Sequence, residues 1–216
     1  MALYLSDLEI VVIIGVVLVV VYFIGSYWKH KKLTKYAHWF EERFRDKARV
    51  KFRSFGHAGL GIKLEMKDRS DGFKEVYFTL SMGARENLMH YPLIFLTRGF
   101  DKISFWGVLE KPVKMNMSIV SSWNKGEIRK TEERPNIRKL SSEELDRIGY
   151  FLYASNTEVA KSFISRSKIT ERLKELRYVE LVETDMTSSL VRVVSRLREE
   201  SLTDLLSFLF YLGRVL

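Results

Sequence analysis

An uncharged, strongly apolar run from Ile10 to Trp28 decides the environment in which this chain folds. Its nineteen residues, at about 1.5 Å each in a helix, are just long enough to cross a hydrocarbon core of about 30 Å. Valine and isoleucine favour strands in water. Within lipid, however, every backbone amide must find a partner inside the segment, and a helix is the only single-segment solution. The run therefore predicts a transmembrane helix over 10–28, after a short extracytoplasmic N-terminus over 1–9.

A cleaved signal peptide is the alternative interpretation of this run. Signal peptides have a basic n-region and small residues at a cleavage site. The first 28 residues contain no Lys or Arg, and the run ends in YW directly before KHKK, so a retained anchor is favoured. Since the lysines all follow the span, the positive-inside rule places the N-terminus outside and the rest in the cytoplasm. The predicted membrane-interface residues are Tyr27, Trp28, Lys29, Lys31, Lys32 and Lys35.

Charge separates the two parts of the chain. The whole chain has a net charge of +9, and residues 1–28 carry two acidic and no basic residues, so the remainder carries +11. A cationic domain on a short tether faces two polyanions, the anionic lipid leaflet and nucleic acid. The sequence has no cysteine, which excludes disulfides and cysteine-ligated metals.

Hydrophobic periodicity predicts the first half of the cytosolic part. A basic juxtamembrane helix is expected over 29–47, because apolar residues recur there at three-to-four spacing. Alternating patterns predict strands, and 84–96 reads as a helix that Pro92 would bend or end. The predicted strands of this half are 49–55, 61–66, 76–82, 102–109 and 114–121.

The second half begins with a polar segment over 124–140, interpreted as an exposed connection. A capping box of Ser141 and Glu144 then predicts a helix with Leu145, Ile148, Phe151 and Leu152 on one face. Further predictions are helices over 157–165 and 168–177, strands over 178–184 and 189–198, and an apolar helix over 201–216 opened by a second capping box of Ser201 and Asp204. The last helix is expected in the core, on the membrane or on a partner. The predicted fold class is α+β: one transmembrane helix, then a mixed cytosolic domain over 48–216 with antiparallel-type strands.

Catalytic and metal-binding motifs are not found in the sequence. None of His30, His38, His57 and His90 has a second ligand at metal-binding spacing. The glycines of 56–61 precede a predicted strand, whereas a phosphate-binding loop must lead into a helix. We therefore expect a non-enzymatic protein without cofactor, metal or small-molecule substrate.

Basic residues form groups that would suit the phosphate backbone of RNA, although an ordinary solvated surface explains about half of them. Base-specific recognition is not indicated, since no RNP-type aromatic motif is present. A further group, Arg192, Arg196 and Arg198, lies on the last predicted strand. The candidate RNA or partner contacts are Arg43, Arg45, Lys47, Arg49, Lys51 and Arg53, and then Lys125, Arg129, Lys130, Arg134, Arg138 and Lys139.

The order of elements resembles the calumin family, the single-span, coiled-coil-domain-containing subunits of the eukaryotic PAT complex at the translocon. The similar stretch is FTLSMGARENLMHYPLIFLTRGFDKISFWGVLEKP (78–112), with Arg85, Asn87 and Leu88 at the family's R-x-[DN]-L-like positions. The chain lacks that family's acidic region before the span and its basic coiled coil after the domain, which suggests a compact, archaeal-like relative. The coiled coil helps that family to grip the ribosome, so ribosome contact here would fall on the globular domain.

The resemblance implies a non-enzymatic accessory factor near the protein-conducting channel and the ribosome, which assists insertion or folding of multi-spanning proteins. The implied partners are the bilayer, channel or other small membrane proteins, and ribosomal RNA through backbone contacts. Two alternatives stay open: a membrane-anchored scaffold that binds anionic lipid or a partner protein without the ribosome, and a tethered enzyme whose site has no recognised motif.

Overall fold

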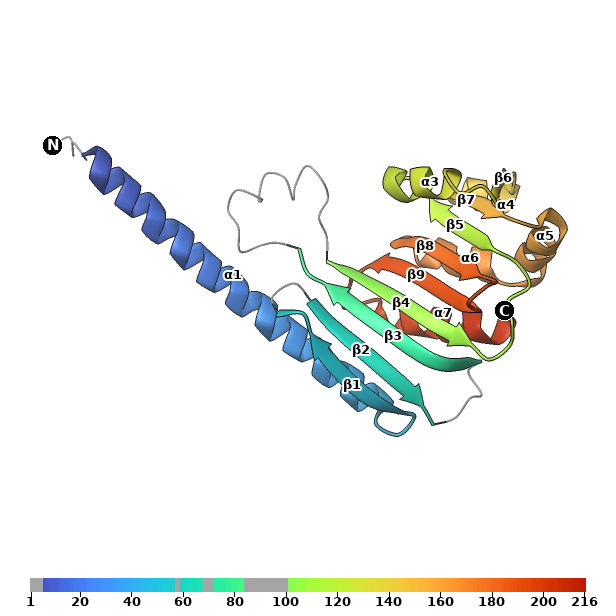
Figure 1. Ribbon diagram of the computed structural model, residues 1–216, viewed down its shortest axis with the longest axis horizontal. Helices are drawn as coiled ribbons and strands as arrows, with labels where there is room; N and C mark the ends of the chain where they lie inside the picture. The colour runs from blue at the N-terminus through green and yellow to red at the C-terminus, as the bar shows by residue number, and fades with distance from the viewer. Residues whose placement is uncertain (1–5, 57–58, 68–71, 84–100) are drawn as a thin grey trace.

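The computed structural model describes residues 6–56, 59–67, 72–83 and 101–216, and it has the predicted α+β architecture (Figure 1). A long helix, α1 (Asp7–Phe44), leads into one sheet with further helices. The strands are β1 (Ala48–Ser54), β2 (Gly59–Met66), β3 (Phe73–Ser81), β4 (Lys102–Leu109), β5 (Met117–Ser121), β6 (Arg138–Leu140), β7 (Tyr150–Ala154), β8 (Val179–Asp185) and β9 (Leu190–Arg196). The other helices are α3 (Lys125–Glu132), α4 (Glu143–Arg147), α5 (Thr157–Arg166), α6 (Ile169–Glu175) and α7 (Leu202–Val215).

Helix α1 is one continuous element of 38 residues, about 57 Å long. A capping box opens it, in which the Ser6 hydroxyl accepts from the Glu9 amide while the Glu9 carboxylate accepts from the Ser6 amide. Its first half is long and apolar enough to cross a membrane, and no residue of its most apolar window is buried. Its second half buries Leu33, Tyr36, Phe40 and Phe44 at helical spacing. One helix thus supplies both the candidate span and part of the domain core.

The nine strands form a single antiparallel sheet in the order β1-β2-β3-β4-β9-β8-β5-β7-β6. A tight turn, closed by the Lys47 amide on the Phe44 carbonyl at 3.0 Å, joins α1 to β1. Because the turn is so short, β1 runs back along α1 toward its N-terminus. The alternation of buried and half-exposed residues along β2, β3 and β4 matches the alternation that predicted these strands.

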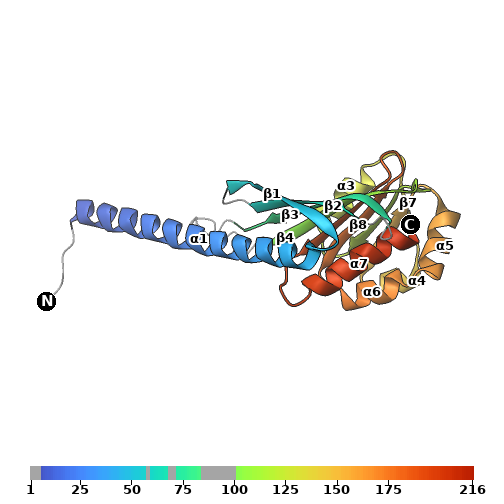
Figure 2. The ribbon, with the colours of Figure 1, turned by 90° about the horizontal axis from the view of Figure 1, so that it is seen from below.

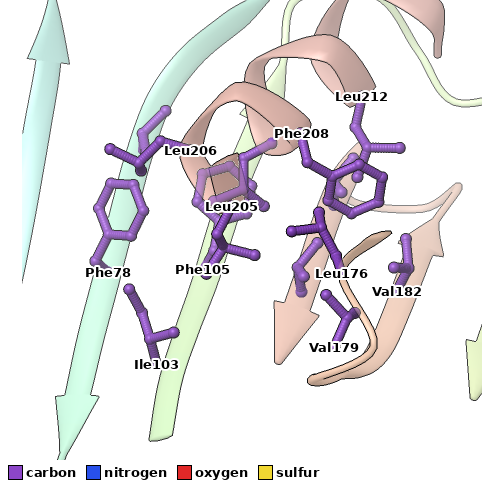
Figure 3. Packing of buried hydrophobic residues seen from close by; sticks show 14 of the residues in the cluster. Phe78, Ile103, Phe105, Leu176, Val179, Val182, Leu205, Leu206, Phe208 and Leu212 are labelled. Atoms are coloured by element: carbon purple, nitrogen blue, oxygen red, sulfur yellow. The ribbon is translucent and has the colours of Figure 1, made fainter. Parts of the chain in front are cut away.

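The main core lies between the sheet and a layer of helices that includes the second half of α1, α7, α6, α4 and α5 (Figure 2). Phe40 of α1 is fully buried, with its ring 4.9 Å from that of Phe78 in β3. Helix α7 directs Leu205, Leu206 and Phe208 at the sheet (Figure 3). The terminal apolar helix is therefore a core helix, which is one of the three roles expected for it.

The opposite face of the sheet is covered in part by α3. A small cluster of Val120, Tyr153, Leu181 and Val194 lies there, and Ile128 of α3 packs against it. The buried carboxylates of Glu180 and Glu183 lie at the same face. The Glu180 carboxylate lies 2.7 Å from Lys102 Nζ and accepts a hydrogen bond from the side-chain amide of Asn124 at 2.9 Å.

The prediction of an exposed connection over 124–140 is wrong in its secondary structure. The segment contains α3 and β6, because Asn124 caps the helix by accepting from the Glu127 amide at 3.2 Å. Ion pairs along the helix surface, Lys130–Glu127 at 2.9 Å and Arg129–Glu133 at 3.0 Å, add stability. Pro135 follows the helix end, as expected of a residue that cannot continue it.

The helix predicted from Ser141 ends earlier than expected. Helix α4 stops at Arg147, Gly149 adopts a left-handed φ of +81°, and Phe151 and Leu152 lie in strand β7. Neither predicted capping box forms, since the observed N-caps Ser142 and Ser201 make no side-chain cap bond. The helices predicted over 157–165 and 168–177, and the last strand pair, are confirmed within two residues. The helix predicted over 84–96 lies outside the described residues.

Candidate membrane-proximal site

One end of the sheet lies beside the point where the apolar run of α1 gives way to lysines. The seven residues of β1 extend about 23 Å, which is the length of about fifteen residues in helix α1. Counting back from Phe44, the end of β1 and Phe55 therefore reach the level of Lys29. Because neighbouring strands are antiparallel, the end of β3, the start of β4, the end of β9 and the start of β8 lie at this same end of the sheet.

Two ion pairs fix α1 to this end of the sheet. Lys32 Nζ lies 2.8 Å from the carboxylate of Asp101, which is 4% exposed and immediately precedes β4. The other Asp101 oxygen accepts from the Gly83 amide at 3.0 Å. Lys35 Nζ lies 2.6 Å from Glu199, just beyond β9, and this hydrogen bond lowers the pKa of the Glu199 carboxyl. Removing one partner costs more for the part-buried Lys32–Asp101 pair than for the exposed Lys35–Glu199 pair, because it leaves a charge that water solvates poorly.

The predicted interface residues thus divide into two sets. Tyr27 and Trp28 are 66% and 68% exposed, and Lys31 is exposed, as residues in contact with lipid headgroups would be. Lys29 is buried, and Lys32 and Lys35 pair with carboxylates of the domain. Sequence reasoning missed the pairing because the partner carboxylates lie far along the chain, with nothing nearby to mark them.

A cavity of about 730 Å³ opens between α1 and this end of the sheet. Its apolar wall includes Val21, Ile24 and Gly25 of the candidate span, together with Met82 after β3. Its polar wall contains the four lysines Lys29, Lys31, Lys32 and Lys35 and the two carboxylates that pair with them. The cavity therefore extends from the apolar segment of α1 to its basic segment, and its lining carries a formal charge of +2.

A second, smaller cavity of about 250 Å³ lies at the same end of the sheet. Arg177, Arg196 and Arg198 line it with Tyr178 and Trp123. The guanidinium of Arg196 lies 3.9 Å from the centre of the Trp123 ring, which is a cation–π contact. Two of the arginines belong to the group noticed on the last predicted strand, whereas no sequence pattern marked Trp123 or Arg177.

The two candidate RNA-contact groups lie on different parts of the sheet. The first group lies at the end of α1 and on β1, the first strand, whereas the second lies on α3, which contacts β5, and on β6, the last strand, with Arg134 in between. Strands are spaced about 4.8 Å apart, so about 29 Å of sheet separates β1 from β5 and about 38 Å separates β1 from β6. The fold does not bring them together into one basic surface.

Many residues of both groups already have partners within the domain. Lys51 pairs with Glu65 at 2.6 Å. Arg134 pairs with Glu183, and Lys139 Nζ lies 3.7 Å from the centre of the Phe151 ring. Arg129 and Lys130 are held in the helix-surface pairs of α3. The remaining members, Arg43, Arg45, Lys47, Arg49, Arg53, Lys125 and Arg138, are exposed.

Metal-binding geometry is not seen in the described parts of the chain, where no three His, Asp or Glu side chains converge. His30 and His38 are exposed on α1, and His57 and His90 lie outside those parts. This end of the molecule carries cations and aromatic rings around two cavities, and the larger cavity begins at the apolar segment of α1. Such a surface suits amphipathic anions or a membrane-embedded partner.

Comparison with known proteins assigns no family. No protein-family model matches the chain, and no curated protein matches it in sequence. Among solved structures, the mycobacterial trehalose monomycolate transport factor A, TtfA, is similar over 79% of this chain and 73% of its own, with a TM-score of 0.43 and 8% identity. Similarity of this degree carries no functional argument.

Proposed function

We propose that this protein is a non-enzymatic accessory factor that is anchored in the membrane, with its N-terminus outside and its domain in the cytoplasm. The domain acts on lipid or on membrane-protein partners at the bilayer surface. The observation that supports this most is the continuity of α1, whose first half has the length and composition of a span and whose second half is buried in the domain core.

Continuity matters because α1 runs unbroken from the candidate span into the domain core, without a flexible linker between them. A domain on a flexible linker samples many heights and orientations. Here any tilt of the span would also tilt the sheet, since Phe40 and Phe44 are buried against it and Asp101 holds Lys32. The cationic end of the sheet would then face lipid headgroups, or the cytosolic loops of neighbouring membrane proteins, at a fixed height.

The more specific form of the proposal comes from the resemblance to the calumin family. In that form the protein works near the protein-conducting channel and the ribosome, and it assists insertion or folding of multi-spanning proteins. Any ribosome contact would use exposed basic residues of the domain, on β1 or on α3 and β6. The alternative is a scaffold that binds lipid or a membrane protein without the ribosome.

Purification from native membranes separates the two forms. The tagged full-length protein is solubilised in mild detergent, and the proteins that accompany it are identified at low and moderate salt. Channel subunits together with ribosomal proteins, the latter lost as salt rises, would support the insertion factor. Membrane-protein partners without ribosomal proteins would refute the ribosomal form and support the scaffold. Recovery of neither would refute both forms of partner binding.

Paired charge variants locate any ribosome contact. Arg49→Gln with Arg53→Gln removes two exposed cations from β1, and Lys125→Gln with Arg138→Gln removes one from α3 and one from β6. The slope of log affinity against log salt should become less steep by about 1.4 to 1.8 for the pair whose group contacts RNA and stay unchanged for the other pair. Unchanged slopes for both pairs would exclude these cations from RNA contact.

A further inference from the structure

We infer that a cavity between the end of α1, α6 and α7 binds a small phosphorylated molecule with at least two negative charges. The cavity has a volume of about 310 Å³ and lies in the helix layer (Figure 2). There α7 contacts α1 through the rings of Phe210 and Phe44, and it contacts α6 through Tyr211 and Arg172. The inference goes beyond the proposed function, because it assigns a ligand to a site away from the candidate span.

The lining of the cavity carries an excess of positive charge. Its four cations are Arg43, Lys47, Arg172 and Arg214, and no Asp or Glu lines it among the residues that the structure describes. Arg214 has a partner and is not counted. The side chains of Arg43 and Lys47 are exposed and make no hydrogen bond or ion pair within the described ranges. Arg172 contacts only the Tyr211 ring in this way, so three cations are left without a counter-ion there.

Helix ends explain where each arginine occurs, but not why the arginines share one cavity. Arg43, Arg172 and Arg214 each lie in the last turn of a helix, where the C-terminal carbonyls favour a cation. Arg45 and Lys174 occupy similar positions at the ends of α1 and α6, yet they do not line the cavity. Each helix end supplies only about half a negative charge, so the cavity stays positive.

The donors of the lining suit phosphate. A guanidinium presents a planar fork of N–H groups that binds two oxygens of one phosphate, and a lysine adds a compact charge. The guanidinium of Arg172 lies 4.2 Å from the centre of the Tyr211 ring, a contact that orients the fork before a ligand arrives. Thr203 and Ser207 add hydroxyl groups. A phosphorylated molecule with two or more charges would offset most of the excess, whereas a single carboxylate would not.

Size and position favour a small soluble ligand over a lipid headgroup or RNA. The volume lies at the lower end of the range for small-molecule sites, about 300–1,000 Å³. Arg43 follows Trp28, the last residue of the uncharged run, by fifteen residues, which is about 22 Å along α1. In the proposed membrane location this distance lies well beyond the Debye length of about 8 Å. RNA carries its charges singly along an extended chain, which a small concave site does not follow.

Isothermal titration calorimetry of the full-length protein in a neutral detergent at physiological salt tests the inference, with inorganic pyrophosphate as the probe. The wild type should bind one pyrophosphate per chain with a dissociation constant below about 1 mM. Arg43→Gln and Arg172→Gln should each weaken binding at least about tenfold, because each removes charge-assisted hydrogen bonds. Since no lipid or partner protein is present, failure of this experiment leaves the proposed function standing, and the reverse also holds.

Matched variants control for net charge and for the helix ends. Arg45→Gln and Lys174→Gln each remove an exposed cation from the same two helix ends, outside the cavity. Both should bind pyrophosphate within about twofold of the wild type, because a distant exposed cation is screened. Thermal unfolding without the probe checks that each variant is folded. If Arg172→Gln is unstable because it loses the contact with Tyr211, Arg43→Gln still tests the inference.

Three outcomes would overturn the inference. These are no binding of pyrophosphate up to about 10 mM, equal losses in Arg43→Gln and Arg45→Gln, and equal losses in Arg172→Gln and Lys174→Gln. A single-stranded oligouridylate is the second probe. Binding of this RNA without binding of pyrophosphate, weakened more by the two lining variants than by their controls, would assign the cavity to RNA and refute the small ligand.

Discussion

Phe40→Ala tests whether the second half of α1 is part of the domain core. Phe40 is fully buried and lies 4.9 Å from the Phe78 ring, 5.1 Å from Trp39 and 6.1 Å from Phe44, measured between ring centroids. Truncating a buried Phe to Ala costs about 3–5 kcal/mol, from lost burial and from the cavity that remains. For a domain of this size 1 kcal/mol shifts the melting temperature by about 2–4 °C. The expected decrease is therefore at least about 6 °C.

The assay is thermal unfolding of the full-length protein in detergent, followed by near-ultraviolet circular dichroism. Phe23→Ala is the matched control, because Phe23 belongs to the same helix and is 66% exposed in the candidate span. It should change the melting temperature of the domain by less than about 2 °C, as expected for a residue without core contacts. Equal melting temperatures for the two variants would refute the packing of α1 against the sheet.

Three further predictions concern local interactions. Asp101→Ala breaks the part-buried pair with α1 and should cost about 1–3 kcal/mol in chemical denaturation, whereas Glu199→Ala breaks an exposed pair and should cost under about 1 kcal/mol; equal losses would contradict the assigned burial. Gly72 and Gly56 both have a left-handed φ, +79° and +64°, but a Cβ at Gly72 would meet a backbone carbonyl of α7, whereas a Cβ at Gly56 would meet open space. Gly72→Ala should therefore destabilise the domain more than Gly56→Ala in the same denaturation assay, and the reverse order would contradict the close approach of Gly72 to α7. Burial, and then a hydrogen bond to Glu132, raises the pKa of Tyr153 from 10.0 to about 12, so the stability that its protonated hydroxyl contributes is complete below pH 10 and is lost between pH 10 and 12. Tyr153→Phe should make the free energy of unfolding less dependent on pH over that window, and a pH profile equal to that of the wild type would contradict the raised pKa.

Strong periodicity made most of the fold predictable from sequence. The alternation in β2 and β4 and the helical spacing of Leu33, Tyr36 and Phe40 are local patterns that survive in the folded chain. Helix α3 was missed because only Ile128 marks an apolar face between its caps, and its remaining stability comes from ion pairs and from contact with the sheet. Strand β7 was missed because a short apolar run such as YFLYA suits either a helix or a strand.

The candidate site was predictable only on its helical side. The lysines after the apolar run follow from membrane topology, and Tyr27 and Trp28 from the aromatic belt. Their partners Asp101 and Glu199 lie 69 and 164 residues away from the lysines that they contact. A single sequence contains no local pattern that links positions so distant, since only the order of strands in the sheet brings them together.

The depth of two labelled positions tests most directly whether the domain is held against the membrane. The chain has no cysteine, so Phe55→Cys and Met186→Cys each create one labelling site, at opposite ends of the sheet and about 23 Å apart along the strands. In vesicles, a spin label at position 55 should contact oxygen more and aqueous nickel less than one at position 186. Equal, fully aqueous accessibility at both positions would contradict the account, because the sheet would then lie clear of the bilayer.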